Sequence, residues 1–138
     1  MSYRYLEHMT DAFIEVIGDT IEEAFENAGI SVVDTILDIK SVESKLERKI
    51  EINADDLKGL LYSWLEEIII LTITDGFAAS KFKVKISKNE KFHLNATVNG
   101  EEINFEKHHF KLEIKAPTYH LMDIKEEKPI VMRFILDL

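Results

Sequence analysis

Two aspartates near opposite ends of the sequence carry the strongest signal for chemistry. Asp11 follows the polar stretch His8-Met9-Thr10, and Asp137 is followed by Leu138 and its α-carboxylate. If the strands that carry them are neighbours, these carboxylates converge and repel one another unless a hard cation such as Ca²⁺, Mg²⁺ or Mn²⁺ joins them. The alternative is a solvated tail at Asp137 and an aspartate at position 11 that only caps a loop turn.

The histidines do not follow a zinc-binding pattern. His108 and His109 are adjacent and would face opposite sides of an extended strand, and no His-x-His or His-Glu-x-x-His spacing exists. His120 could serve as a general base, as a neighbour of metal ligands or as a partner contact; the alternative is a hydrogen-bonded structural residue. Without cysteine, a glycine-rich phosphate loop or a Gly-x-Ser-x-Gly motif, the usual thiol, nucleotide-binding and acyl-transfer chemistries are not expected.

Composition predicts one soluble domain over residues 1–138. Of the 138 residues, 46% are hydrophobic and 31% are charged, and no linker-like stretch divides them. The formal net charge of −9 disfavours direct, nonspecific binding of nucleic acid. We expect no membrane span, because charged and polar residues interrupt the most apolar stretch, and the absence of cysteine allows a reducing, cytoplasmic setting.

Periodicity predicts two helices in the first half of the chain. Short strands are expected at 3–5 and 13–17, followed by a helix over 20–36 with a capping box at Thr20 and Glu23 and a break near Gly29. A strand at 45–52 precedes a second helix, which we expect to be capped by Asp55 and to be the more buried of the two. The β-branched end of this helix, 68–74, could instead form a strand.

Alternation predicts strands through the second half. We expect a hairpin of 82–86 with 92–98, a turn at Asn99-Gly100, a strand at 110–114, and pairing of 118–124 with 130–136. The fold class is therefore α+β: a single-domain sandwich with a largely antiparallel β-sheet and two main helices. A basic patch also falls in this half, and it reads either as an edge strand guarded against aggregation or as an interaction surface; it comprises Lys81, Lys83, Lys85, Lys88 and Lys91.

Taken together, several segments resemble the archease family. They occur in the family's order and at nearly its usual length: Tyr5-Leu6-Glu7-His8 with Asp11, Gly18-Asp19-Thr20 opening a helix, Ala54-Asp55-Asp56-Leu57, Lys115-Ala116-Pro117-Thr118-Tyr119-His120, and the closing Phe134-Ile135-Leu136-Asp137-Leu138. Two positions depart from the family pattern. Phe13 stands where the loop commonly has glycine, and Leu136 replaces the usual aromatic residue before the terminal aspartate.

The resemblance implies a cofactor protein of the GTP- and metal-dependent tRNA-splicing ligase, cytoplasmic and not itself an enzyme. Such a protein promotes ligase guanylylation and multiple turnover in tRNA exon joining, and it meets tRNA only through the ligase. The resemblance also implies a calcium-type site, with Mg²⁺ or Mn²⁺ as alternatives, made by Asp11, Asp137 and an oxygen of Leu138. His8, Tyr119 and His120 are expected to contact the partner or to lie beside the metal ligands.

Two other functions compete with this interpretation. One is a metal-dependent phosphoesterase that would use His8, Asp11 and His120, although the sequence shows no nucleophile or phosphate cradle. The other is a chaperone or adaptor for RNA-processing or tRNA-modifying enzymes, a role that has also been proposed for archeases. Activity of the isolated protein on phosphoesters, or binding to such clients without an effect on the ligase, would distinguish these alternatives.

Overall fold

The computed structural model describes residues 2–6 and 11–138. In this part of the chain, two α-helices and seven strands follow one another with a short 3₁₀-helix and a π-helical turn. The elements are β1 (Tyr3–Leu6), β2 (Asp11–Gly18), α1 (Ile21–Ile36), η1 (Ile39–Ser41), β3 (Leu46–Ala54), α2 (Leu57–Ile69), η2 (Ile70–Thr74), β4 (Phe77–Lys88), β5 (Phe92–Glu102), β6 (Ala116–Lys125) and β7 (Ile130–Asp137).

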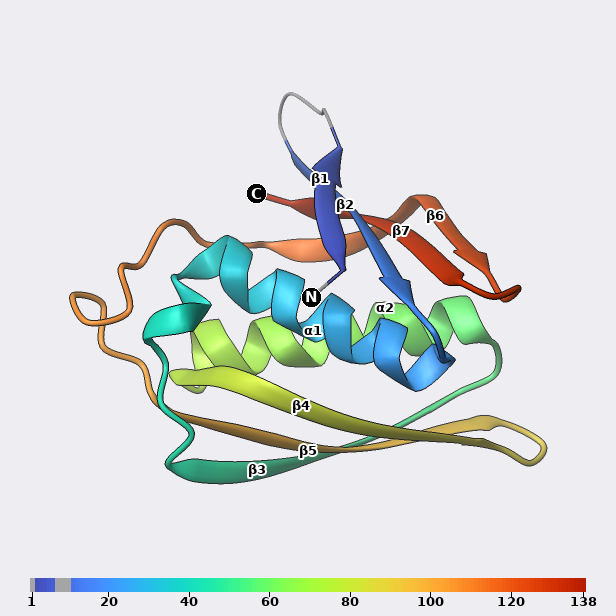
Figure 1. Ribbon diagram of the computed structural model, residues 1–138, viewed down its shortest axis with the longest axis horizontal. Helices are drawn as coiled ribbons and strands as arrows, with labels where there is room; N and C mark the ends of the chain where they lie inside the picture. The colour runs from blue at the N-terminus through green and yellow to red at the C-terminus, as the bar shows by residue number, and fades with distance from the viewer. Residues whose placement is uncertain (1, 7–10) are drawn as a thin grey trace.

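The elements form three layers, with both helices between two sheets (Figure 1). One sheet has the strand order β1-β2-β7-β6 and the other β3-β5-β4, and every pairing is antiparallel. Apolar side chains from both inner sheet faces and both helices fill the core. The predicted α+β sandwich is confirmed, and its antiparallel strands are divided between two sheets.

Helix α1 is the more enclosed of the two helices, contrary to the expectation for α2. Ten of its sixteen residues are buried, against six of thirteen in α2. The helix also runs without a break through Gly29. A Cβ at this position would come within 3.0 Å of the Phe82 ring and 3.2 Å of Ile68. Glycine at this position therefore serves close packing against β4 and α2.

The helix ends follow the predicted chemistry with two corrections. The Thr20 hydroxyl accepts a 3.1 Å hydrogen bond from the backbone N–H of Glu23, as the capping box predicts. The second helix is capped by Asp56 and not by Asp55, since the Asp56 carboxylate accepts from the N–H of Gly59 at 2.7 Å. Residues 70–74 continue this helix as a π-helical turn and do not form a strand.

Two predictions in the second half are wrong. Asn99-Gly100 lies inside β5 and makes no turn: Gly100 faces Ala79 beside an irregularity of the register, and a Cβ there would lie 1.9 Å from the carbonyl oxygen of Ala78. Residues 110–114 form no strand, because the N–H of Lys111 donates to the last carbonyl of α1, at Ile36, over 2.7 Å. This segment is therefore hydrogen-bonded to the C-terminal end of α1 and not to a strand.

The remaining strand pairings agree with the alternation. β4 pairs with β5 as a hairpin, and β6 pairs with β7, with a break in register between Thr118 and Asp123. Leu121, inside that irregular stretch, has a φ of 58°, which is the left-handed region. Over the described parts of the chain, no helix is long and apolar enough to cross a membrane.

Candidate functional site

Pairing of β2 with β7 places Asp11 directly opposite Asp137. The ladder runs without interruption from this pair to Gly18 opposite Ile130. Directly opposed residues in an antiparallel ladder share one face, with Cβ atoms about 4.5–5.5 Å apart. Two aspartates separated by most of the sequence thus lie side by side at one end of the sheet.

The hydrophobic pattern of the two strands fixes this register. Ala12 faces Leu136 and Ile14 faces Phe134, and all four side chains are buried against the helices. A slip by one residue would move this entire set to the outer face of the sheet. Asp11, next to Ala12, is therefore held on the outer face as the first residue of β2, and not in a loop as the sequence suggested.

Neighbouring segments fix the position of Asp137. Ala116 of β6 lies opposite it on the other side, and the backbone N–H of Lys115 donates to its carbonyl oxygen at 2.8 Å. That bond occupies the main chain of Asp137, whereas its side chain belongs to the outer face with Asp11. Leu138 follows directly and is half-exposed.

The donor chemistry of this pair fits a hard divalent cation. Two carboxylates supply at most four oxygens, and Ca²⁺ takes six to eight oxygen ligands. Within residues 2–6 and 11–138, no three His, Cys, Asp or Glu side chains gather closely enough to hold an ion. Two aspartates alone would therefore supply only part of a coordination shell, and an oxygen of Leu138, water or a partner would have to supply the rest.

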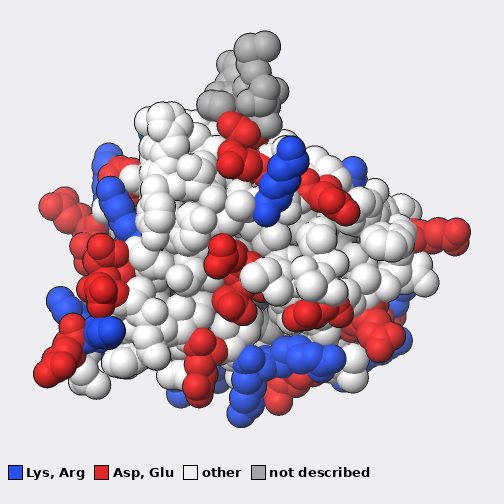
Figure 2. Space-filling view, turned by 180° about the vertical axis from the view of Figure 1, so that it is seen from behind, with Lys and Arg blue, Asp and Glu red and all other residues white. Residues whose placement is uncertain are grey.

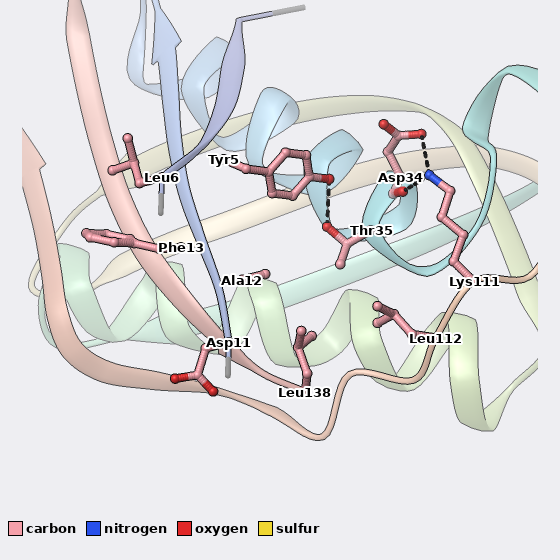
Figure 3. A pocket seen from close by; sticks show the side chains of 10 residues that line it. All are labelled: Tyr5, Leu6, Asp11, Ala12, Phe13, Asp34, Thr35, Lys111, Leu112 and Leu138. Atoms are coloured by element: carbon pink, nitrogen blue, oxygen red, sulfur yellow. Dashed lines mark hydrogen bonds and ion pairs between the residues drawn. The ribbon is translucent and has the colours of Figure 1, made fainter. Parts of the chain in front are cut away.

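A hollow of about 630 Å³ lies at the same end of the sheet (Figure 3). The Tyr5 hydroxyl is 2.9 Å from the Thr35 hydroxyl, and Lys111 donates to the Asp34 carbonyl at 2.8 Å. Burial raises the pKa of Tyr5. The Leu138 side chain points into the hollow, whereas the carboxylate of Asp11, which also lines the hollow, points away from it.

The other predicted site residues do not join this pair. His8 lies outside the described residues. Tyr119 stacks on Tyr62 of α2 with ring centroids 4.4 Å apart, and its partial burial raises its pKa. His120 is exposed beside it, four residues along β6 from Ala116, which faces Asp137. Their roles as partner contacts stay predictions.

His108, by contrast, is a structural residue. It is fully buried, and its Nδ1 accepts from the N–H of Asn104 at 2.9 Å. Its Nε2 therefore carries the proton and donates to Glu101, also at 2.9 Å. The backbone N–H of Glu43, then Lys107 and His108, lower the pKa of Glu101 to about 2. Sequence spacing did not reveal this buried carboxylate, because its partners come from two separate segments of the chain.

Several known proteins are similar to this chain over nearly its whole length. The model of the Archease protein family matches residues 3–138. "Protein archease" of Pyrococcus abyssi is 42% identical over 127 residues, covering 91% of this chain and 88% of that protein. "Protein archease" of Methanothermobacter thermautotrophicus is 39% identical over 138 residues, covering 99% and 98%.

The fold has a solved counterpart among these relatives. The solution structure of Methanobacterium thermoautotrophicum protein 1598 is 38% identical and has a TM-score of 0.85, with 99% of each chain covered. An antiparallel α+β sandwich of this kind is thus a known architecture. The chain belongs to the archease family.

Proposed function

We propose that this protein activates the GTP- and metal-dependent tRNA-splicing ligase, promoting its guanylylation and multiple turnover. In this proposal Asp11, Asp137 and a main-chain or terminal oxygen of Leu138 hold a divalent cation, Ca²⁺ in the first place and Mg²⁺ or Mn²⁺ as alternatives. The single observation that carries the proposal is the register that sets Asp11 opposite Asp137. Membership of the archease family supports the ligase as the proposed partner.

The charge of the chain supports a role through protein contacts. With a net charge of −9, the protein as a whole repels RNA, so the ligase would hold the tRNA exons. An acidic ladder end is suited to a cation shared with a partner, because its own oxygens do not complete a calcium shell. The protein would therefore position an ion or a ligase conformation and leave the joining reaction to the ligase, which makes it an activator without catalysis of its own.

The test mixes the ligase with GTP and Mn²⁺, with and without this protein, and follows guanylylation and repeated turnover. We expect the wild type to accelerate both, and Asp11→Asn and Asp137→Asn to lose most of that acceleration. Asp123→Asn is the matched control, because it removes the same charge from β6, where the aspartate faces Arg133. Unchanged ligase kinetics with the wild type would overturn the proposed activity.

Calorimetric titration with Ca²⁺ tests the metal site independently of the ligase. We expect heat of binding from the wild type and from Asp123→Asn, and none from Asp11→Asn or Asp137→Asn. Titrations of both site variants that match the wild type would remove the assignment. Turnover of a generic phosphoester by the isolated protein, abolished by Asp11→Asn, would instead favour the enzyme alternative.

A further inference from the structure

The outer face of the β3-β5-β4 sheet carries an ordered array of polar side chains. The strand registers align them in rows that cross the sheet, with a lysine of β4 at one end of each row and a neutral side chain of β5 in the middle. The rows are Glu47–Asn99–Lys81, Lys49–Thr97–Lys83 and Glu51–Asn95–Lys85.

Alternation along the strands holds these lysines in solvent. Val84 of β4 and Ala96 of β5 point inward and are buried, so Lys81, Lys83 and Lys85 point outward and are exposed. Residues two apart on a strand are about 6.7 Å apart, and the line of three lysines along β4 therefore spans about 13 Å. The result is a regularly spaced line of positive charge on an acidic protein.

The cross-strand neighbours of this line of charge are neutral, and the Glu26 carboxylate at the edge of β4 is engaged by the N–H of Val84 at 2.9 Å. The cross-strand neighbours of the three lysines are Asn99, Thr97 and Asn95, whereas the glutamates of β3 lie two strands away, about 10 Å across the sheet. In the described part of the chain, no ion pair joins these three lysines to a carboxylate.

The remaining lysines of the predicted basic patch have contacts of their own. Lys91 pairs with Asp55 at 3.5 Å, and Lys88 lies over the Phe92 ring, 5.0 Å from its centroid. Both are close to the tip of the β4–β5 hairpin. The lysines that remain available to a ligand are therefore the line of three along β4, together with Lys49 of β3.

We propose that this face, which we call the lysine face (Lys49, Lys81, Lys83, Lys85, Asn95, Thr97 and Asn99), contacts the phosphate backbone of double-stranded RNA. The inference rests on the proposed function for the identity of that RNA, the substrate held by the ligase. Figure 2 shows acidic side chains spread over the molecule and a group of basic ones along its lower rim, on the side of the three-stranded sheet. A ligand docked there meets the face where the repulsion from the acidic chain is weakest.

The side chains favour a double-stranded nucleic acid over a single strand. Lysine, asparagine and threonine are residue types that contact phosphate and sugar oxygens, and each row here pairs a cation with a neutral hydrogen-bonding group. Binding of single strands relies on aromatic side chains that stack on bases, and the lysine face as defined contains none. The contacts would therefore be sequence-independent, and they would orient the protein on RNA that the ligase already holds.

Fluorescence anisotropy with a short labelled RNA duplex tests the proposal, using the full chain and no ligase. The variant Lys81→Gln/Lys83→Gln/Lys85→Gln is compared with Lys40→Gln/Lys58→Gln/Lys128→Gln, which removes the same charge from exposed sites elsewhere. We expect the wild type to bind at low salt, with log affinity falling linearly against log salt concentration. Loss of the three β4 lysines should reduce that slope by about three units, and the control should keep most of it.

Three results would overturn the proposal: no binding by the wild type at low salt, equal loss in both variants, or more effective competition by polyglutamate than by unlabelled RNA. The last result would identify an acidic protein as the partner. If the β4 variant aggregates while its RNA binding is unchanged, the lysines only guard the edge strand. Because no ligase is present, failure here leaves ligase activation standing, and failure of ligase activation leaves this measurement unaffected.

Discussion

Two carboxylates on the same strand have opposite electrostatic surroundings. Glu15 and Asp11 both lie on the outer face of β2 and both face β7. Glu15 is buried between two arginines, with Nε of Arg4 at 2.7 Å and Nε of Arg133 at 2.8 Å from its oxygens. Asp11, four residues away, faces the carboxylate-bearing Asp137.

The contrast distinguishes a carboxylate held by arginines from one that faces a second acid. Hydrogen bonding from Arg4 is the main cause that lowers the pKa of Glu15, and Arg133 adds to it. Like charges directly opposite one another destabilise an antiparallel pair. The strand pair thus supplies arginines to Glu15 and a second aspartate opposite Asp11, and the proposed metal site uses the second arrangement.

The largest expected effect comes from making the Glu15 position resemble the Asp11 position. Arg133→Glu removes one partner of a buried carboxylate and sets a like charge opposite it, with Arg4 as the remaining partner. We expect the free energy of unfolding to fall by about 2–3 kcal/mol, measured by urea denaturation. Arg133→Lys, which keeps the charge, should lose less than half as much. Equal stability of wild type and Arg133→Glu would contradict the structural role of Glu15.

A ligand effect of similar size is expected at the other position. Calcium at a hundred times its dissociation constant should raise the free energy of unfolding of the wild type by about 2.7 kcal/mol, through preferential binding to the folded state. Thermal denaturation with and without Ca²⁺ measures this. Asp137→Asn should show no such increase, and a calcium response that survives in this variant would place the ion elsewhere.

A smaller effect is expected when the Asp11 position is made to resemble Glu15. Asp137→Arg replaces the opposing acid with a cation, and an exposed cross-strand pair contributes about 0.2–1 kcal/mol. Without divalent ions this variant should therefore be slightly more stable than the wild type, and it should lose activation of the ligase. A less stable variant would show that Asp137 contributes to folding as well as to binding.

The last expected effect is a dependence on pH that distinguishes the structural carboxylates. Glu101, with a pKa of about 2 in the folded protein against an ordinary 4.5, stabilises the fold fully above pH 4.5 and loses that contribution as the pH falls towards 2. Denaturant titrations across this range should show a shallower decline for Glu101→Gln than for the wild type. Identical declines would show that the native interactions of Glu101 do not stabilise its ionised form.

Local patterns were sufficient to predict most elements, because their causes lie within a few residues. The capping box at Thr20 and the alternation on β4, β5 and β7 are set by neighbouring side chains, and the structure confirms them. Gly100 was misread as a turn residue. Glycine stands there because the carbonyl of Ala78, on another strand, leaves no room for a side chain. Sequence proximity carries no information of that kind.

Prediction of the candidate site succeeded and failed for the same reason. The pairing of Asp11 with Asp137 was predictable once their strands were taken as neighbours, because period-two alternation then determines the face. The Glu15 cluster, the Glu101 cluster and the hollow beside Leu138 were not, since each joins segments that no short-range pattern links. Tyr119 was noticed by motif alone, and its stacking on Tyr62 became visible only in the fold.

The order of the layers has a consequence for how the molecule could be used. The acidic pair lies on the outward side of one sheet and the lysine face on the outward side of the other, with both helices in between. A cation at the acidic pair and an RNA backbone at the lysine face could therefore be bound at the same time without a steric clash. In these proposals, the thickness of the three layers would set the distance between the bound cation and the RNA backbone.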